Sequence, residues 1–210
     1  MNSSLRVIGL TGGIASGKSS VSAVLRNSGI PVMDADSLGH LVLAKDGAAY
    51  ADVVQTFGSD ILNPDDTINR QRLGQLVFDN PSERRKLEAL THPAIAELAG
   101  RGLKMIAERG EPLAVYEAAL LVETGIYEGM DGLIVVSCTL ENQLFRLCAR
   151  DQMSKKDAAT RIACQFPLEE KLAVADYVVE NNGSYADLEA AAGHLATQLR
   201  QRYYPSGGLV

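Results

Sequence analysis

The fold is decided by residues 5–19, which read Leu5-Arg6-Val7-Ile8-Gly9-Leu10-Thr11-Gly12-Gly13-Ile14-Ala15-Ser16-Gly17-Lys18-Ser19. The largely apolar run at its start is typical of a buried strand. The octet from Gly12 to Ser19 fits the pattern G-x-x-x-x-G-K-S/T. Residues 20–27 carry apolar side chains at helical spacing, and the pattern stops at Gly29. A glycine-rich octet between a strand and a helix predicts a phosphate-binding loop.

The chemistry of such a loop assigns a role to each kind of residue. Backbone N–H groups at a helix N-terminus point at phosphate oxygens, and the helix dipole favours an anion there. Lys18 reaches the β- and γ-phosphates, and the Ser19 hydroxyl binds Mg²⁺. We expect a nucleoside triphosphate to be bound by Gly13, Ile14, Ala15, Ser16, Gly17, Lys18, Ser19 and Ser20. The alternative, an accidental turn rich in glycine and serine, is disfavoured by the flanking strand and helix.

The composition indicates one soluble domain with insertions. The chain has 210 residues, of which 46% are hydrophobic, and this is enough for one substantial core. A net charge of −6 argues against general affinity for nucleic acid. No run approaches the ~18 apolar residues of a membrane helix, and residues 1–4 lack the order of a secretory signal, so we expect a cytoplasmic protein. Cys138, Cys148 and Cys164 show no C-x-x-C spacing and are expected to be reduced, structural residues.

Short β-rich runs alternate with longer helical patterns along the chain. This order is typical of a parallel sheet with crossover helices. After the first strand, such runs occur at 30–33, 113–116, 133–136 and 177–180. The last helix opens at Ser184, with Asp187 three residues later in the manner of a capping box. We therefore expect an α/β fold with a five-stranded parallel sheet between layers of helices.

The gap between the second and third strands is longer than one crossover helix needs. It covers 37–109 and contains helical stretches around 53–57, around 73–77 and after Pro81. A further helix is expected to open at Pro93, because the fixed φ of proline suits a first helical turn. This helical insertion should lie over the carboxyl ends of the strands and hold a second substrate. The core then comprises 1–36 and 110–204, and 205–210 form a flexible tail.

Two carboxylates, Asp34 and Asp36, follow the second strand directly. At the carboxyl end of a strand, near a phosphate loop, they are placed to accept a proton from an attacking hydroxyl or to hold Mg²⁺ through water. The alternative is an aspartate that caps the following helix. Both interpretations stay open for each residue.

Cationic side chains after the fourth strand are candidates for binding phosphates. A buried helical stripe is expected from residues at i, i+4, i+7 and i+8, namely Leu140, Leu144, Leu147 and Cys148. Arg146 and Arg150 then lie one turn apart on another face and could meet one ligand. Arg161 follows the polar connection 152–157, with Gln165 one turn beyond it. The alternative for each arginine is a solvated position on an amphipathic helix.

Taken together, several motifs resemble the dephospho-CoA kinase family. They are the loop 11–19, Asp34-Ala35-Asp36, Thr91-His92-Pro93, the stretch 120–123, Arg161 to Gln165 through Lys171, Asp176-Tyr177 and Asn181-Asn182-Gly183. The phosphate loop alone is shared by a large superfamily. The ordered set is specific, and it extends over nearly the whole chain.

The resemblance implies a three-layer P-loop kinase core with a helical substrate-binding insertion and a helical lid at 140–170. The implied activity is transfer of the γ-phosphoryl group of ATP to the ribose 3′-hydroxyl of dephospho-CoA, with Mg²⁺, as the last step of coenzyme A synthesis. Asp36 would be the general base, and Asp34 a supporting or magnesium-linked residue. The implied partner is a small molecule, with no membrane or nucleic acid, and the implied state is a monomer or weak homo-oligomer.

The same resemblance suggests further site residues. Arg146 and Arg150 are similar to lid arginines that close on the phosphates of ATP, with Arg146 also catalytic. Asn181 and Gly183 would border the adenine, although Asn181-Asn182-Gly183 also reads as a structural turn. Residues implied to bind the acceptor are Thr11, Asp36, His92, Leu120 and Arg161. The alternative for His92 is a residue that only shapes the turn before Pro93.

Two positions depart from the family pattern. Ala15 stands where glycine is common, which is acceptable if this position is helical or extended. Glu117 stands where the family usually has aspartate, which moves the carboxylate by one methylene and puts a magnesium role for Glu117 in doubt.

Two other functions stay open. One is a P-loop kinase acting on a nucleoside, a nucleotide or a sugar hydroxyl, and the other is a nucleotide-hydrolysing regulatory module. A GTPase is expected to show N-K-x-D, and the sequence contains no such tetrad. The aspartate pair and the lid arginines favour transfer over switching.

Overall fold

The computed structural model describes residues 4–78 and 80–204, which fall into two compact units. Among the described residues, one unit comprises 4–33 and 106–204, and the other comprises 34–78 and 80–105. The expected flexible tail at 205–210 and residues 1–3 of the N-terminal stretch lie outside the described residues.

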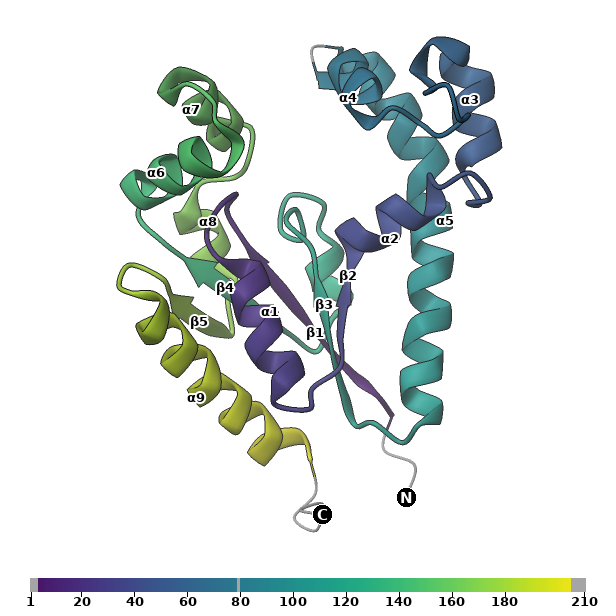
Figure 1. The fold of residues 1–210 in the computed structure, drawn as a ribbon. Coiled ribbons are helices and arrows are strands. Elements are labelled where there is room, and N and C mark those ends of the chain that lie inside the picture. Colours follow the sequence, from purple (N-terminus) through teal and green to yellow (C-terminus); the bar gives the residue numbers. More distant parts are fainter. Residues whose placement is uncertain (1–3, 79, 205–210) are drawn as a thin grey trace. The chain divides into compact units, whose positions relative to one another are not determined.

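The first unit is built on a five-stranded sheet in the order β2-β3-β1-β4-β5 (Figure 1). The strands are β1 (Arg6–Gly12), β2 (Val32–Asp34), β3 (Leu113–Glu117), β4 (Gly132–Ser137) and β5 (Tyr177–Glu180). β1 pairs in parallel with β3 and β4, and β4 pairs in parallel with β5. The predicted parallel sheet is confirmed, and the bounds of β5 agree with the prediction from sequence.

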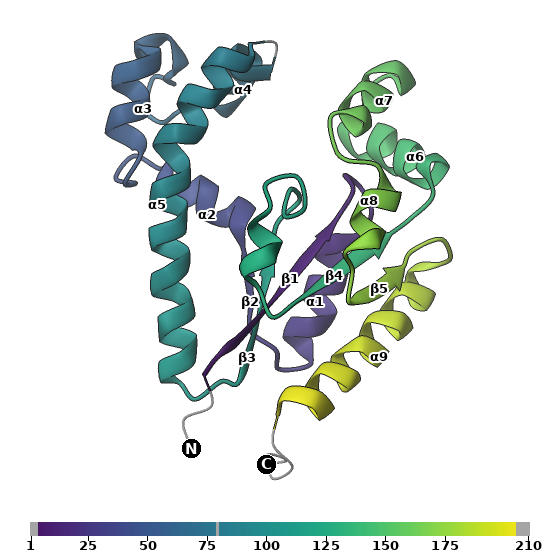
Figure 2. The ribbon, with the colours of Figure 1, turned by 180° about the vertical axis from the view of Figure 1, so that it is seen from behind.

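Helices cover both faces of this sheet. The helices of this unit are α1 (Lys18–Asn27), α6 (Leu140–Asp151), α7 (Lys155–Ala163), α8 (Leu168–Ala173) and α9 (Tyr185–Tyr203), with a short 3₁₀ helix η2 (Ile126–Gly129). α1 and α9 lie on one face, whereas α8 lies on the other (Figures 1 and 2). The expected capping box is present, because Ser184 and Asp187 each accept a hydrogen bond from the other's backbone N–H.

The strands direct alternate side chains to the two faces, as the period of a β-strand requires. On one face Ile8, Ile134 and Val136 join a core with side chains of α1 and α9. On the other, Leu133 and Val135 pack with Leu121 and with residues of α8. A sheet buried on both faces explains why its strands read as nearly continuous apolar runs.

The second unit is mostly helical. It contains α2 (Ala35–Val42), α3 (Tyr50–Phe57), a 3₁₀ helix η1 (Ser59–Ile61), α4 (Arg70–Phe78) and most of α5 (Pro81–Glu108). Its own core is formed by Val42, Ala49, Val53, Ile61, Ile68 and Leu73. The helical character predicted for this part of the chain is therefore present, with the addition of α2.

The prediction of a separate helix beginning at Pro93 is wrong. α5 runs without interruption from Pro81 to Glu108, with Pro93 inside it. Proline removes one hydrogen bond from a helix interior and costs about 3 kcal/mol there. Long helical stretches on both sides supply enough packing and hydrogen bonding to carry the helix through this position.

The three cysteines are free, as expected, with Cys138 buried, Cys148 half-buried and Cys164 exposed. Burial raises the pKa of the Cys138 thiol, although the nearby charge of Arg146 opposes this. Cys138 is therefore held as a neutral thiol.

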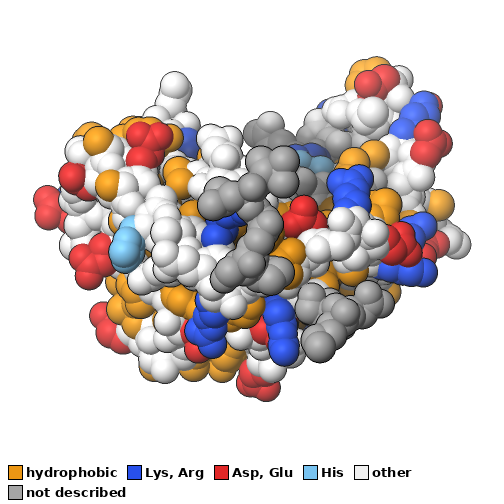
Figure 3. Space-filling view, turned by 90° about the horizontal axis from the view of Figure 1, so that it is seen from below, with side chains coloured by type: hydrophobic (Ala, Val, Ile, Leu, Met, Phe, Trp, Pro, Cys, Tyr) orange, Lys and Arg blue, Asp and Glu red, His pale blue; other side chains and the backbone are white. Residues whose placement is uncertain are grey.

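No helix in the described part of the chain is both long and apolar enough to cross a membrane. On the face drawn in Figure 3, acidic and basic side chains are interspersed.

Candidate phosphate-transfer site

The phosphate loop joins the end of β1 to the start of α1. The Ser16 N–H donates to the Gly13 carbonyl at 3.1 Å, which closes a turn within the loop. Gly17 is the N-cap of α1 and has no side chain to cap it, and the first turn of the helix holds no acidic residue. A helix start built in this way is a binding site for an anion.

Lys18 and the serines of the loop have distinct environments. The Lys18 ammonium lies 3.2 Å from the Gly12 carbonyl, so the side chain folds back along the loop. The Ser16 hydroxyl is buried and has no hydrogen-bond partner among the described residues. Ser19 is exposed and Ser20 half-buried at the start of α1. The Ser19 hydroxyl is therefore accessible to a ligand.

Ala15 does not adopt the helical or extended backbone expected for it. Its φ is +58°, which is the left-handed region. This region crowds a Cβ against the following carbonyl, which is why glycine usually occupies it. The loop therefore carries local strain at Ala15.

Asn181 supports the loop from outside. Its side-chain amide donates to the Ser16 carbonyl at 2.7 Å, and the residue is buried. Gly17 has φ +101°, and a Cβ placed on it would lie 2.2 Å from the Asn181 amide nitrogen. Both the backbone angle and the neighbouring amide therefore require glycine at this position.

Arg146 extends this contact. Its guanidinium donates to the Asn181 carbonyl at 3.0 Å and to the Asn181 side-chain oxygen at 3.1 Å. Its second terminal nitrogen, Nη1, is buried and has no partner among the described residues. Of the predicted cations, Arg146 is thus linked through Asn181 to the phosphate loop. Gly183 lies just beyond, next to the N-cap Ser184 of α9.

Arg150 and Arg161 meet at a different residue. Arg150 donates to both carboxylate oxygens of Asp151, at 2.7 and 3.1 Å, and Arg161 approaches the same carboxylate at 3.4 Å. The hydrogen bonds from Arg150 hold the pKa of Asp151 below its ordinary value. Arg146 and Arg150, which the sequence placed on one helix face, therefore engage different partners.

The buried stripe predicted for α6 is partly wrong. Leu147 is buried, but Leu140 is 58% exposed, and Gln143 is buried instead. The physical reason is a polar one, because the Gln143 amide donates to the Ile14 carbonyl at 2.9 Å. The first turn of α6 therefore presents a glutamine, and not a leucine, to the backbone of the loop.

Sequence reasoning missed the use of two glutamines. Besides Gln143, the side-chain oxygen of Gln165 accepts a hydrogen bond of 2.6 Å from the Ile14 N–H. The sequence marks Gln165 by its spacing from Arg161 and as part of the family motif that ends at Lys171, but neither indicates a contact with the loop, and no motif includes Gln143. The one local signal was a polar residue at a position of α6 that faces inward.

A buried ion pair was also missed. Lys171 is fully buried, and its ammonium lies 2.5 Å from Glu123 and donates to the Ala119 carbonyl at 3.3 Å. Glu123 also accepts a hydrogen bond of 3.1 Å from the Phe166 N–H. No local pattern marks this pair, because Lys171 follows two glutamates in α8 and looks like a solvated residue of a charged helix.

Asp34 and Asp36 lie at the start of α2. Asp34 is the N-cap, and its carboxylate accepts from the N–H groups of Asp36 and Ser37 at 2.9 and 3.3 Å and from the Ser37 hydroxyl at 2.7 Å. The capping interpretation thus describes Asp34. Asp36 sits exposed in the first turn of α2, and its side chain is not used by the cap.

Residues at and just after the end of β3 form contacts with β1 and α1. The buried Thr11 hydroxyl donates to the Ala119 carbonyl at 3.1 Å. Glu117 accepts a hydrogen bond of 2.5 Å from Ser22 of α1 and lies 3.9 Å from Arg26. Leu120 is 45% exposed. The carboxylate of Glu117 is therefore held by α1.

His92 lies in the middle of α5, far from both ends of the helix, and its side chain is exposed. The turn that it was expected to shape does not exist, because the helix continues through Pro93. That alternative for His92 is therefore wrong.

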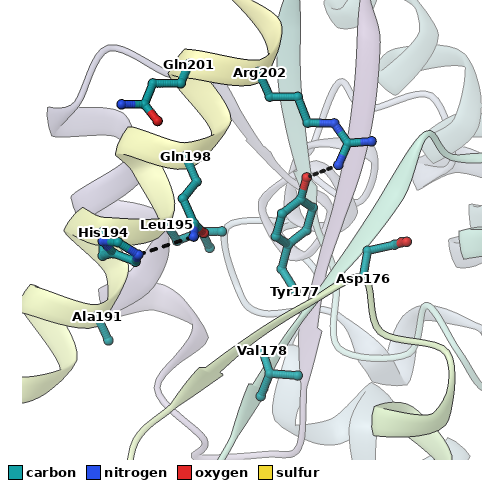
Figure 4. Close-up of a pocket in the computed structure, with 9 residues that line it drawn as sticks. All are labelled: Asp176, Tyr177, Val178, Ala191, His194, Leu195, Gln198, Gln201 and Arg202. Atoms are coloured by element: carbon teal, nitrogen blue, oxygen red, sulfur yellow. Dashed lines mark hydrogen bonds between the residues drawn. The ribbon is translucent and has the colours of Figure 1, made fainter.

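Two cavities of the first unit differ in their relation to the loop. One, of about 760 Å³, is lined by Gly13 and Ser16 of the loop and by Gln143, Gln165 and Lys171. The other, of about 680 Å³, lies between β5 and α9 and contains His194, Gln198 and Arg202 (Figure 4). There Gln198 contacts His194 at 3.2 Å, and Arg202 donates to the Tyr177 hydroxyl at 2.8 Å. The second cavity holds none of the predicted site residues.

Comparison with known proteins matches the chain to one family. The family model for CoaE, dephospho-CoA kinase, matches residues 6–187. A dephospho-CoA kinase from Anaeromyxobacter dehalogenans is 43% identical over 196 residues, covering 93% of this chain and 93% of that protein.

Solved structures agree with this match. The dephospho-CoA kinase from Campylobacter jejuni is 27% identical, with a TM-score of 0.71 over 94% of this chain and 98% of that one. The Thermus thermophilus protein TT1252 is 34% identical, with a TM-score of 0.79 over 92% of this chain and 97% of that one. This chain belongs to the dephospho-CoA kinase family.

Proposed function

We propose that this protein transfers the γ-phosphoryl group of ATP to the ribose 3′-hydroxyl of dephospho-CoA, giving coenzyme A and ADP. The observation that carries the proposal is the match of residues 6–187 to the dephospho-CoA kinase family. The phosphate loop at the start of α1 supplies the ATP-binding half of this chemistry. The enzyme is a kinase with a small-molecule acceptor and ATP as co-substrate.

Binding of the phosphates is the task of the loop and Lys18. Phosphoryl transfer spreads negative charge over the equatorial oxygens of the transferred group, so catalysis depends on positioning and on positive charge. The uncapped start of α1 and the ammonium of Lys18 are suited to that charge. The backbone of 13–20 is proposed to hold the α-, β- and γ-phosphates in line with the acceptor oxygen.

Mg²⁺ is proposed to bind through the Ser19 hydroxyl. Magnesium in kinases is held by one or two protein groups together with phosphate oxygens and waters, and the exposed hydroxyl of Ser19 suits that donor set. When bound, the ion neutralises charge on the β- and γ-phosphates. Glu117 is not assigned to the metal, because its carboxylate is engaged by Ser22.

The arginines of the segment 140–170 are proposed to act as a lid. Arg146 carries a buried, unpartnered nitrogen within the described residues and is the strongest candidate for a phosphate contact in the transition state. Arg150 and Arg161 share Asp151, so a nucleotide phosphate would compete with that carboxylate for them. Asn181 and Gly183 are proposed to border the nucleotide base.

Asp36 is proposed as the general base. Its exposed carboxylate is not used by the cap of α2, whereas that of Asp34 is. A base that accepts the proton of the 3′-hydroxyl raises the nucleophilicity of the attacking oxygen. Asp34 supports this role by fixing the turn that carries Asp36. Acceptor binding is proposed for the helical insertion 37–109, with His92, and for Thr11, Leu120 and Arg161.

A panel of acceptors tests the proposed function. ADP release is followed in a coupled assay with dephospho-CoA, shikimate, gluconate and nucleosides in parallel, and Lys18→Ala serves as the background. We expect release with dephospho-CoA to exceed that with every other acceptor. The same slow rate with all acceptors would instead support a nucleotide-hydrolysing module. We also expect a cytoplasmic protein that is a monomer or a weak homo-oligomer and has no affinity for nucleic acid. Sedimentation with and without DNA tests the oligomeric state and the affinity.

A further inference from the structure

The backbone of Ile14, at the tip of the phosphate loop, is held by two glutamine side chains, one at each of its two peptide groups. Its carbonyl accepts a hydrogen bond of 2.9 Å from the amide nitrogen of Gln143. Its own N–H donates to the side-chain oxygen of Gln165 at 2.6 Å. The two glutamines lie at the start of α6 and after the end of α7, so both ends of the segment 140–170 reach the same loop residue.

The neighbouring glycine leaves space for one of these contacts. A Cβ placed on Gly13 would lie 2.2 Å from the Gln143 amide nitrogen. Unlike Gly12 and Gly17, Gly13 does not have a positive φ, so its backbone would accept other residues. Gly13 is therefore required by the Gln143 side chain and not by its own backbone angle.

The Gln165 contact is anchored from behind. The next residue, Phe166, donates its N–H to Glu123, and Glu123 is paired with the buried Lys171. This fixes the chain beside Gln165 to the segment that follows β3. The position of the Gln165 side chain is thus set by buried contacts as well as by the loop.

We propose that Gln143 and Gln165 are positioning residues for phosphoryl transfer, which together orient the two peptide groups that flank Ile14 and thereby the phosphate-binding amides of the loop. The pair is directional, because Gln143 must donate and Gln165 must accept. It rests on the proposed function only in requiring that the loop binds the phosphates of ATP. A change at either glutamine alters phosphate affinity and leaves the binding of base and ribose unchanged.

The first test removes each hydrogen bond with a side chain of similar shape. Gln143→Met and Gln165→Met are compared with Gln198→Met, which changes an exposed glutamine on α9 whose side chain contacts His194. We expect each loop variant to raise the KM for ATP by about 5–10-fold, the effect of one lost hydrogen bond, with the KM for dephospho-CoA unchanged. Calorimetry should show weaker binding of a non-hydrolysable ATP analogue and unaltered binding of adenosine. Unchanged ATP constants, or an equal loss of adenosine affinity, overturn the proposal.

The same test separates positioning from competition. If Gln165 instead competed with a phosphate oxygen for the Ile14 N–H, Gln165→Met would bind the ATP analogue more tightly than the wild type. Tighter binding overturns the proposal. Faster hydrogen exchange of the Ile14 amide in Gln165→Met, with no change in Gln198→Met, supports it.

The second test uses the direction of the hydrogen bonds. Gln143→Glu and Gln165→Glu add the same charge beside the same loop residue, Ile14. A glutamate at 165 still accepts a hydrogen bond from the Ile14 N–H. A glutamate at 143 cannot donate to the Ile14 carbonyl, and its carboxylate oxygen repels the carbonyl oxygen. We expect Gln143→Glu to lower kcat/KM for ATP at least about 10-fold more than Gln165→Glu, because an unsatisfied and repelled acceptor costs more than a retained bond. Equal losses overturn the proposal.

The third test is a double-mutant cycle on Gly13 and Gln143. Gly13→Ala alone should weaken binding of the ATP analogue about as much as Gln143→Ala, since the new methyl group displaces the amide. In the Gln143→Ala background, Gly13→Ala should add no further loss. Additive losses overturn the proposal. Because analogue binding needs no acceptor, this result stands apart from whether dephospho-CoA is the substrate.

Discussion

The phosphate loop and the turn that carries Asp36 are held in opposite ways. Side chains that brace the loop come from residues 129, 151 and 165 positions away in sequence. The turn at the start of α2 is fixed by hydrogen bonds that span two or three positions. The loop geometry therefore depends on the folding of the whole α/β unit, whereas the turn needs only its own sequence. This difference predicts which substitutions act locally and which act at a distance.

The largest expected effect belongs to the locally held turn. Asp36→Asn should lower kcat with dephospho-CoA by about 10²–10⁴-fold, the range of general acid–base catalysis, because the amide cannot accept the hydroxyl proton. ATP affinity should be nearly unchanged, since the loop is braced independently. Steady-state kinetics with both substrates varied checks this. The matched control is Asp52→Asn, an exposed carboxylate of α3, and wild-type turnover in Asp36→Asn would exclude it as the base.

The next effect tests the buried pair behind Gln165. Glu123→Leu should lower the free energy of unfolding by about 3–5 kcal/mol, because it leaves the Lys171 ammonium buried without its carboxylate. Adding Lys171→Met should restore most of that loss, since a buried ion pair and an apolar pair of similar size are often close in stability. Urea unfolding measures both. Glu128→Gln, an exposed glutamate nearby, should change little, and no recovery in the double variant would contradict the interpretation.

A smaller effect is expected from the cap of α2. Asp34→Ala removes the acceptor for two backbone N–H groups and should cost about 1 kcal/mol of stability. Asp34→Asn keeps a capping oxygen and should stay within about 0.5 kcal/mol of the wild type. Chemical denaturation distinguishes the two variants. Equal losses would indicate that the negative charge, and not the cap, stabilises this turn.

The smallest effect concerns the ion pair between Arg6 and Asp131. Partial burial would raise the pKa of Asp131, but hydrogen bonds from the Arg6 side chain and the Val7 N–H outweigh it and hold the pKa below its ordinary value. A lowered pKa adds stability that is present above about pH 4 and is lost as the pH falls through the value in the folded protein. Asp131→Asn should remove this acid dependence and cost about 0–1 kcal/mol at neutral pH, as for other exposed pairs. Thermal melts between pH 7 and pH 3, set against the wild type, provide the measurement.

The comparison also explains what could be predicted from the sequence. The loop, the parallel strands and the capping box at Ser184 are encoded in short patterns, and the structure confirms them. The roles of Gln143 and Gln165 were not predictable, because each bonds to a backbone group that only the folded sheet brings close. The same holds for Lys171 and Glu123. Partners that are distant in sequence leave no periodic signal.

Two local errors have physical causes of the same kind. Pro93 looks like a helix start by its own preference, but α5 continues through it. Leu140 fits an apolar stripe by spacing, yet α6 turns Gln143 inward to meet the Ile14 carbonyl. In both cases contacts beyond the local sequence outweighed the local preference.

The left-handed backbone at Ala15 has a consequence for how the loop meets its ligand. A non-glycine residue in this region loses about 1–2 kcal/mol in the folded state. Alanine also lowers the conformational entropy of the unfolded chain relative to glycine, which stabilises the folded state by about 0.4–1 kcal/mol. The tip of the loop is thus slightly less stable than a glycine version and has fewer conformations to lose when a triphosphate arrives. Part of the conformational entropy that the loop would lose on binding a triphosphate is therefore already lost when the protein folds. Binding does not incur that part of the cost again at each turnover.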